Sequence, residues 1–197
     1  MTPDTQHRLV AALGVRGSAI PASGLAVTVL PGSPGLYSWW ANEEAARLFG
    51  EVLGAEVTQP IYIGQAGAGR SGATLASRIL KNHLGPRRRR STLRRTIAAV
   101  LDASSATTDN RPVSEAEIST WMRDHLSVVV VPLDDRALVA AAEDAALRVY
   151  DPPLNLKAMM MTESRRRLRQ LRTGRATFTA AEAALDDHPT ARVARPD

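Results

Sequence analysis

Two short apolar runs, each carrying a glycine and a tyrosine, constrain the fold more than any other feature of this sequence. The first contains Gly35-Leu36-Tyr37 and the second contains Tyr62-Ile63-Gly64. Each run has the length and composition of a β-strand. Because the two runs are close in the chain, they can pair antiparallel in one sheet. The sequence therefore predicts a small sheet that presents two tyrosines from neighbouring strands.

The rest of the chain alternates helical patterns with one more strand-like run. The β-branched run at 127–132 is typical of a strand that is buried on both faces, and 25–30 alternates weakly enough to suggest an extra strand. Capping residues, apolar periodicity and helix breakers predict a series of helices, over residues 4–13, 43–53, 74–84, 91–101, 114–126, 135–150, 158–172 and 179–187. This order of elements predicts an α+β fold.

Composition excludes several classes of protein. The 197 residues suffice for one domain with a real core. Cysteine is absent, which excludes disulfides, thiolate metal sites and a cysteine nucleophile, and it fits a reducing cytoplasm. No apolar run approaches the roughly 20 residues that a membrane helix needs, and no signal-peptide pattern is present at the start. We therefore expect a cytoplasmic protein without a membrane segment.

Positive charge is concentrated in two places. Residues 57–101 contain no Asp or Glu but nine Lys and Arg residues, and a second basic run spans residues 165–175. A solvated helix face is the ordinary explanation for a run of mixed charges. One sign over so long a window instead indicates a polyanionic partner. Nucleic acid is favoured over a membrane surface because no bulky aromatic face accompanies the basic run.

The segment Gly67-Ala68-Gly69-Arg70-Ser71-Gly72 matches the glycine pattern of dinucleotide-binding loops. However, the acidic residue expected about twenty positions later is missing, and the following helix leads to another helix rather than to a parallel strand. A flexible loop that leads into a helix is the favoured interpretation.

Glu143 is the most unusual acidic residue of the sequence. On a helix, its neighbours three and four residues away are Val139, Ala140, Ala146 and Leu147, all apolar. A buried carboxylate needs a partner or a metal ion. The alternative is an amphipathic helix whose polar edge lies at Glu143, and the pattern alone does not separate the two.

Taken in chain order, the residues of interest resemble the signature of the GIY-YIG nuclease superfamily. Gly35-Leu36-Tyr37 is similar to the first motif and Tyr62-Ile63-Gly64 is identical to the second. The family then has an arginine on the next helix, a histidine or tyrosine after it, a metal-binding glutamate and an asparagine. These places are filled by Arg78, His83, Glu143 and Asn155, the last two separated by 12 residues. The resemblance covers roughly residues 34–157.

The resemblance implies a fold with named parts. It implies a three-stranded antiparallel sheet, with strands near 35–40, 60–65 and 127–132, flanked by helices. Residues 1–33 would form an N-terminal extension and 158–197 a basic C-terminal helical extension. The two motifs are separated by an insertion at about 42–54, an arrangement similar to the restriction-endonuclease branch of the family.

The resemblance also implies metal-assisted hydrolysis of a phosphodiester. Glu143 would hold Mg²⁺ or Mn²⁺, because hard cations suit a carboxylate and water. Tyr37, with Tyr62 beside it, would orient or deprotonate the attacking water. Arg78 would clamp the scissile phosphate, and Asn155 would fix the site by hydrogen bonding.

The place of His83 in this site depends on the geometry of its helix. On an ideal α-helix, the five-residue spacing separates Arg78 and His83 by roughly 140°. The sequence therefore predicts either that the helix ends early and His83 swings back, or that its role is lost. If present in the site, His83 could donate a proton; it could equally be a histidine favoured by the helix dipole.

These observations together predict a metal-dependent DNA endonuclease, possibly of the restriction type, with six catalytic residues: Tyr37, Tyr62, Arg78, His83, Glu143 and Asn155. A non-catalytic nucleic-acid-binding protein of the same fold and a structure-selective repair or recombination nuclease are the alternatives. The oligomeric state is open between monomer and homodimer. The residues predicted to bind nucleic acid are basic and follow the second strand or lie in the C-terminal helix: Lys81, Arg87, Arg88, Arg89, Arg90, Arg94, Arg95, Arg165, Arg166 and Arg167.

Overall fold

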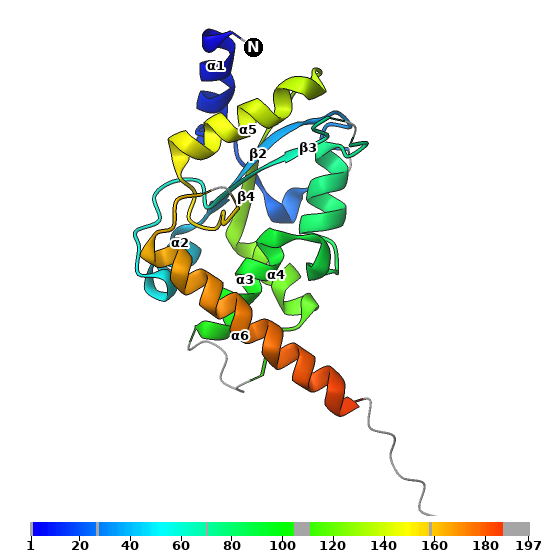
Figure 1. The fold of residues 1–197 in the computed structure, drawn as a ribbon. Coiled ribbons are helices and arrows are strands. Elements are labelled where there is room, and N and C mark those ends of the chain that lie inside the picture. The colour runs from blue at the N-terminus through cyan, green and yellow to red at the C-terminus, as the bar shows by residue number, and fades with distance from the viewer. Residues whose placement is uncertain (1, 27, 70, 105–110, 158, 187–197) are drawn as a thin grey trace, which may run out of the picture.

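The computed structural model describes residues 2–26, 28–69, 71–104, 111–157 and 159–186, without the side chains of Arg88 and of 175–186. A central sheet and the helices around it form an α+β fold, which confirms the predicted class (Figure 1). The helices and strands are α1 (Pro3–Leu13), β1 (Ile20–Pro21), β2 (Gly35–Ala41), α2 (Glu43–Leu53), β3 (Tyr62–Ala66), η3 (Ser77–His83), α3 (Thr92–Ala103), α4 (Glu115–His125), β4 (Leu126–Pro132), α5 (Arg136–Tyr150) and α6 (Glu163–Asp186). Three short 3₁₀ segments are η1 (Arg16–Ser18), η2 (Ala22–Gly24) and η4 (Arg88–Arg90).

The sheet is antiparallel with strand order β1-β4-β2-β3. The three predicted strands are present, but the prediction of a three-stranded sheet is wrong because β1 adds a fourth strand. β1 pairs only Ile20 and Pro21 with β4, and two residues are too few to leave a period-two pattern. The expected strand at 25–30 is also wrong. Its described residues include a turn at 28–30, and only Leu25 and Leu30 are buried there.

Helices cover both faces of the sheet (Figure 1). Because side chains alternate along a strand, Leu36 and Ile63 pack with α1 and α5 on one face. Tyr37, Trp39 and Tyr62 belong to the larger core on the other face. The two signature tyrosines therefore lie on the same face of the sheet, the one covered by α2, α3, α4 and α6.

The glycine of the second motif makes room for the tyrosine of the first. Tyr37 pairs with Gly64 across β2 and β3. A Cβ atom on Gly64 would lie 2.4 Å from the Tyr37 hydroxyl oxygen, far inside van der Waals contact. Gly35 has a similar constraint, since its Cβ would lie 2.3 Å from the Val131 carbonyl oxygen. Both glycines are thus required by close packing at these positions.

The insertion between the two motifs is part of the core. Asn42 caps α2 by accepting a hydrogen bond from Ala45 N–H at 2.9 Å, and Gly54 ends the helix with φ of 67°. Phe49 is fully buried and packs edge-on against Trp121 of α4 with ring centroids 5.7 Å apart. α2 is therefore fixed against the body of the protein by apolar burial.

The C-terminal helix α6 lies across α3 and α2 (Figure 1). It begins at Glu163 rather than at the predicted residue 158, and Leu168 anchors it in the core with no exposed surface. Within the described part of the chain, no helix combines the length and apolarity required to cross a bilayer.

Candidate active site

The helix after β3 is a π-helix, and this settles the position of His83. The predicted α-helix at 74–84 is wrong over residues Ser77–His83. Leu84 N–H donates to the carbonyl of Ile79, five residues earlier, at 2.9 Å. A turn of this helix holds more residues than a turn of an α-helix, so residues five apart lie closer together around the axis. The spacing that separates Arg78 and His83 on an α-helix therefore brings them together here.

His83 lies between the two signature tyrosines. Its Nε2 atom is 2.6 Å from the Tyr37 hydroxyl oxygen, and its ring centroid is 6.0 Å from that of Tyr62. Burial, together with the charges of Arg78 and Arg94, lowers the pKa of His83 to about 3. The imidazole is therefore neutral at physiological pH, and it donates through one ring nitrogen and accepts through the other.

Arg78 supplies positive charge to the tyrosines. Burial raises the pKa of both Tyr37 and Tyr62, and the Arg78 guanidinium opposes this rise in each case. Burial also disfavours the charge on Arg78, but Tyr37, Tyr62 and Glu143 together raise the pKa of Arg78 above its usual value. The buried Nε of Arg78 has no hydrogen-bond partner among the described residues. A donor of this kind is available to an acceptor that enters the site.

Glu143 reaches the same cluster from α5, which packs against the edge strand β3. Val139 and Ala146 on its helix face are fully buried, while Glu143 itself is half-buried. Burial and the neighbouring Asp144 raise the pKa of Glu143 to about 7, against the charges of Arg78 and Lys157. Glu143 thus lies at the edge of the buried face of α5, next to the exposed Asp144, and is partly desolvated there.

The Glu143 carboxylate fits a hard divalent cation. None of the described residues donates a hydrogen bond or forms an ion pair with it, and a desolvated carboxylate needs such compensation. Carboxylate oxygen and water are the ligands that Mg²⁺ prefers. The described residues contain no group of three or more His, Asp or Glu side chains that could enclose a metal. A cation held by Glu143 would therefore complete its coordination with water and substrate oxygens.

Asn155 joins the site to the segment that follows α5. Its Oδ1 accepts a hydrogen bond from Ile63 N–H at 2.9 Å, and its Nδ2 donates to Ile63 O at 2.8 Å. These two bonds satisfy the backbone of the edge strand β3, between Tyr62 and Gly64. Asn155 thus lies beside the site and fixes the strand that carries Tyr62.

Two arginines predicted to bind nucleic acid are structural instead. Arg94 has no exposed surface; its guanidinium bonds to Glu115 at 2.7 Å and to the His83 carbonyl at 3.2 Å. Arg165 is 1% exposed and donates to the carbonyl oxygens of Asn155, Asp151, Pro152 and Met160. The predictions for Arg94 and Arg165 are wrong because both guanidiniums are enclosed. Their terminal nitrogens donate to groups inside the protein.

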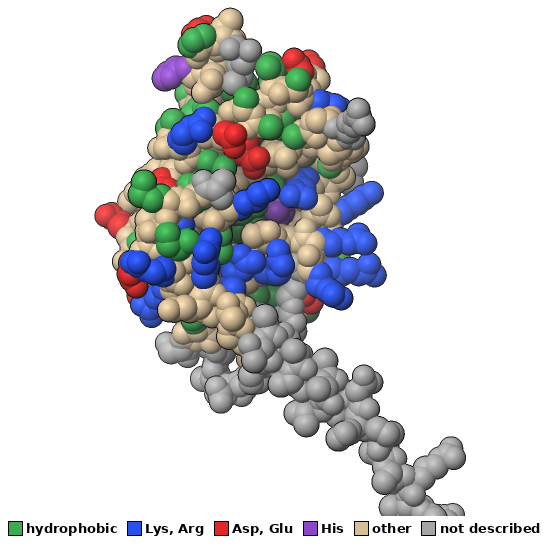
Figure 2. Space-filling model, in the orientation of Figure 1, with side chains coloured by type: hydrophobic (Ala, Val, Ile, Leu, Met, Phe, Trp, Pro, Cys, Tyr) green, Lys and Arg blue, Asp and Glu red, His purple; other side chains and the backbone are tan. Residues whose placement is uncertain are grey.

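Seven of the other basic residues predicted for the interface are exposed. Lys and Arg side chains form a band across the face shown in Figure 2. Arg166 is paired with Glu163 on its own helix, and the side chain of Arg88 lies outside the described residues. The exposed members are Lys81, Arg87, Arg89, Arg90, Arg95, Arg166 and Arg167. This surface remains the predicted contact for a polyanion.

The sequence did not indicate that Ser91, Lys157 and Arg172 act on the site, by a hydrogen bond or by their charges. Ser91 was recognised only as a helix cap, but its hydroxyl oxygen also lies 2.7 Å from His83 Nδ1. Arg172 of α6 acts on Tyr62 electrostatically, and Lys157 acts on Glu143. The capping pattern was the one available signal for Ser91, whereas the contact with His83 depends on tertiary structure.

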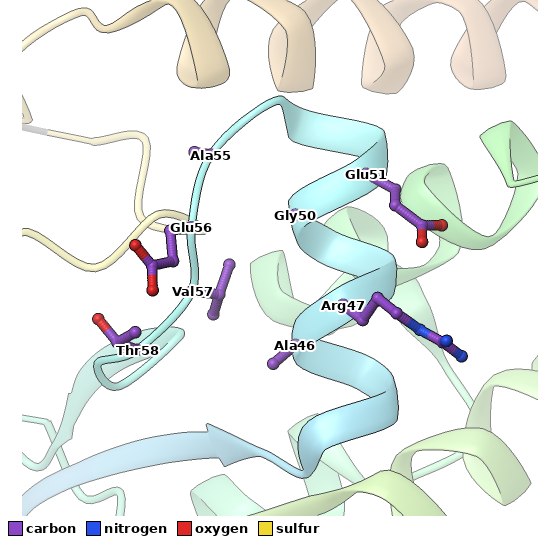
Figure 3. Close-up of a pocket in the computed structure, with 8 residues that line it drawn as sticks. All are labelled: Ala46, Arg47, Gly50, Glu51, Ala55, Glu56, Val57 and Thr58. Atoms are coloured by element: carbon purple, nitrogen blue, oxygen red, sulfur yellow. The ribbon is translucent and has the colours of Figure 1, made fainter.

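The tyrosine cluster is distinct from a groove of about 420 Å³ between α2 and residues 55–58 (Figure 3). Figure 3 shows Arg47 and Glu51 pointing away from that segment, so Ala46, Gly50 and Val57 make up much of the wall. None of the six predicted catalytic residues lines this groove. The charged and desolvated groups converge at the tyrosine cluster, which is therefore the candidate active site.

One of the comparisons with known proteins identifies a family. Residues 35–174 match the GIY-YIG catalytic domain family, so the chain belongs to that family, which is associated with endonucleases. The match extends from the first glycine of β2 into α6. No curated protein and no solved structure matches the chain.

Proposed function

We propose that this protein is a metal-dependent endonuclease that hydrolyses phosphodiester bonds in DNA. The observation that carries the proposal is one buried cluster in which His83 Nε2 lies 2.6 Å from the Tyr37 hydroxyl oxygen and the His83 and Tyr62 ring centroids lie 6.0 Å apart. The charges of Arg78 and Glu143 act on both tyrosines. His83 is hydrogen-bonded into the same cluster through Tyr37. The surrounding basic surface favours a polyanionic substrate.

Each residue has a chemical role in this proposal. Arg78 binds the scissile phosphate through its free buried Nε and keeps positive charge beside Tyr37. Tyr37, once ionised, accepts a proton from the attacking water while the water oxygen bonds to phosphorus. Tyr62, whose ring centroid lies 6.0 Å from that of His83, orients the water. Asn155 holds β3 in position through Ile63.

Glu143 would hold the cation, Mg²⁺ or Mn²⁺, which when bound supplies positive charge to the phosphate and the leaving oxygen. The carboxylate is suited to this because it is partly desolvated, and among the described residues Arg78 and Lys157 act on it by charge without forming a close ion pair. Its raised pKa also means that cation binding competes with a proton near neutral pH. Binding should therefore strengthen as the pH rises above about 7.

The insertion helix α2 favours a restriction-type enzyme over a structure-selective one, because the restriction branch of the family resembles this layout. The competing idea of a non-catalytic binder was based on the displacement of His83 from Arg78. In the π-helix, His83 is hydrogen-bonded to Tyr37 and Arg78 acts on the same tyrosine, which supports the catalytic proposal. We also propose a cytoplasmic location, because a sequence without cysteine fits a reducing compartment.

The experiment incubates the protein with supercoiled plasmid, linear duplex and branched DNA, with Mg²⁺, Mn²⁺ or EDTA. We expect cleavage with either cation and none with EDTA. Sequencing of the product ends should give one short recognition sequence. Cleavage only at branch points would overturn the restriction assignment, and binding of all three DNAs without cleavage would overturn the catalytic proposal.

A further inference from the structure

Ser91 is enclosed at the point where α3 begins, directly behind His83. Its hydroxyl is 2.7 Å from His83 Nδ1, and the residue is 2% exposed. The same oxygen accepts the Arg94 backbone N–H at 3.0 Å as the cap of α3. Ser91, His83 and Tyr37 thus form a continuous hydrogen-bonded chain that ends at the candidate active site.

The hydrogen-bonded chain of Ser91, His83 and Tyr37 contains more donor protons than free acceptor sites. A neutral imidazole has one N–H donor and one acceptor nitrogen, and here it lies between two hydroxyl groups. Only one of these hydroxyls can donate to the ring. If Ser91 donates to Nδ1, then Nε2–H donates to the Tyr37 oxygen. If Tyr37 donates to Nε2, then Nδ1–H donates to Ser91, and the serine proton must find another acceptor.

The two ends of this hydrogen-bonded chain, Ser91 and Tyr37, differ in which other groups could accept a hydroxyl proton. Among the described residues, Ser91 Oγ contacts the Arg94 N–H, which is a donor, and the His83 ring. A buried hydroxyl proton without an acceptor is unfavourable. The Tyr37 hydroxyl is buried as well, and Arg78 donates a hydrogen bond to it. Its other neighbours in the site, Tyr62 and Glu143, carry oxygens that can accept a proton, whereas no such acceptor faces Ser91 among the described residues.

We infer that Ser91 is a positioning residue that fixes His83 as the Nε2–H tautomer, so that His83 donates a hydrogen bond to the Tyr37 oxygen. The proton of Tyr37 then points into the active site. When Tyr37 is ionised, its oxygen accepts from His83, and Ser91 and His83 keep all their hydrogen bonds. The low pKa of His83 supports this role, because a ring that resists a second proton is a poor base.

This inference rests on the proposed function only for its catalytic consequence. In the hydrolytic step, the Tyr37 anion takes a proton from water, the water oxygen bonds to phosphorus, and the bond from phosphorus to the leaving oxygen breaks. Solvent protonates the leaving oxygen, and Tyr37 later returns its proton to solvent. His83 remains neutral throughout and acts as a hydrogen-bond donor rather than as the base.

The tautomer can be measured without any activity. Protein labelled with ¹⁵N at histidine is studied by NMR at neutral pH, and the His83 ring signals are assigned by comparison with His83→Gln. We expect a protonated Nε2 and an unprotonated Nδ1. A wild-type ring protonated at Nδ1 would overturn the inference, and it would leave the proposed nuclease function untouched.

Two substitutions of Ser91 separate hydrogen-bond donation from helix capping. Both Thr and Asp cap helices well, but Thr keeps a hydroxyl donor whereas an ionised Asp can only accept. We expect Ser91→Asp to lower kcat about tenfold or more with little change in KM, and Ser91→Thr to stay within about threefold of wild type.

The same NMR experiment on Ser91→Asp should show protonation moving to Nδ1, and this holds whether or not the wild type cleaves DNA. Equal kcat values for Ser91→Asp and wild type would overturn the inference. So would a loss of kcat in Ser91→Thr as large as that in Ser91→Asp. If Ser91→Asp does not fold, the wild-type tautomer and the Thr variant still decide the question.

Discussion

His83 should make the protein sensitive to acid over a defined range of pH. The pKa of His83 is lowered from 6.5 to about 3 by burial and by the charges of Arg78 and Arg94. Below pH 6.5 the unfolded chain takes up a proton at this residue, whereas the folded protein does not until about pH 3. The free energy of unfolding therefore falls as the pH drops through this window, and the contribution is constant above it.

The size of the effect follows from the shift. Each pH unit within the window changes the free energy of unfolding by up to about 1.4 kcal/mol, so the loss between pH 7 and pH 5 is about 2 kcal/mol from His83 alone. The assay is urea unfolding, followed by tryptophan fluorescence at pH 7, 6 and 5. His83→Gln removes the titrating group and should flatten the curve by this amount, although its stability at pH 7 is lower.

His7 provides the matched control, because it is exposed on α1. His7→Gln should follow the wild-type pH dependence, because it leaves His83 and the buried groups around it unchanged. All other acid-titrating groups are common to the three proteins. If wild type and His83→Gln lose stability in parallel between pH 7 and pH 5, the buried neutral histidine is refuted.

Three further outcomes follow from the structure. Arg94→Met should lower the free energy of unfolding by about 3 kcal/mol, because it breaks a buried pair with Glu115 and several hydrogen bonds. An exposed ion pair contributes at most about 1 kcal/mol, so a smaller loss than this in urea unfolding would contradict the structural role of Arg94. Gly64→Ala should abolish most DNA cleavage while the protein stays folded, because the new Cβ would lie 2.4 Å from the Tyr37 hydroxyl; wild-type cleavage rates would show that the close approach is wrong. Arg89→Gln, at an exposed position, should leave stability unchanged and reduce the slope of log binding constant against log salt by about 1; an unchanged slope in a salt titration would remove this residue from the DNA contact.

Much of the fold could be predicted from local sequence patterns, because local interactions determine many of its helices and strands. The strands around Tyr37 and Tyr62 and the capped helix α2 have strong signals in the sequence. β1 was missed because its two residues are held by pairing with β4, a contact distant in sequence. The π-helix was missed for a related reason. Its sequence fits an α-helix, and the wider turn is compatible with burial of both Ile79 and His83 in the core.

The candidate site was predictable where residue type and spacing were unusual. Glu143 was identified by a carboxylate among apolar neighbours, and the structure shows it half-buried. The arginines were less predictable, because charge alone does not tell an exposed guanidinium from an enclosed one. Arg94 and Arg95 are adjacent, yet one is fully buried and the other exposed. The two side chains point to different sides of α3, and which side is buried can be told only when the position of the core is known.

The central claim is that Glu143 acts in catalysis by holding a divalent cation in a DNA-cleaving site. The most direct test is the single-turnover cleavage rate of Glu143→Gln in Mg²⁺, measured beside its DNA affinity in Ca²⁺. The exposed Glu51 of α2 gives the control variant Glu51→Gln. We expect Glu143→Gln to cleave at least about 100-fold more slowly, with DNA affinity and the control both close to wild type. Cleavage by Glu143→Gln at the wild-type rate would contradict the account.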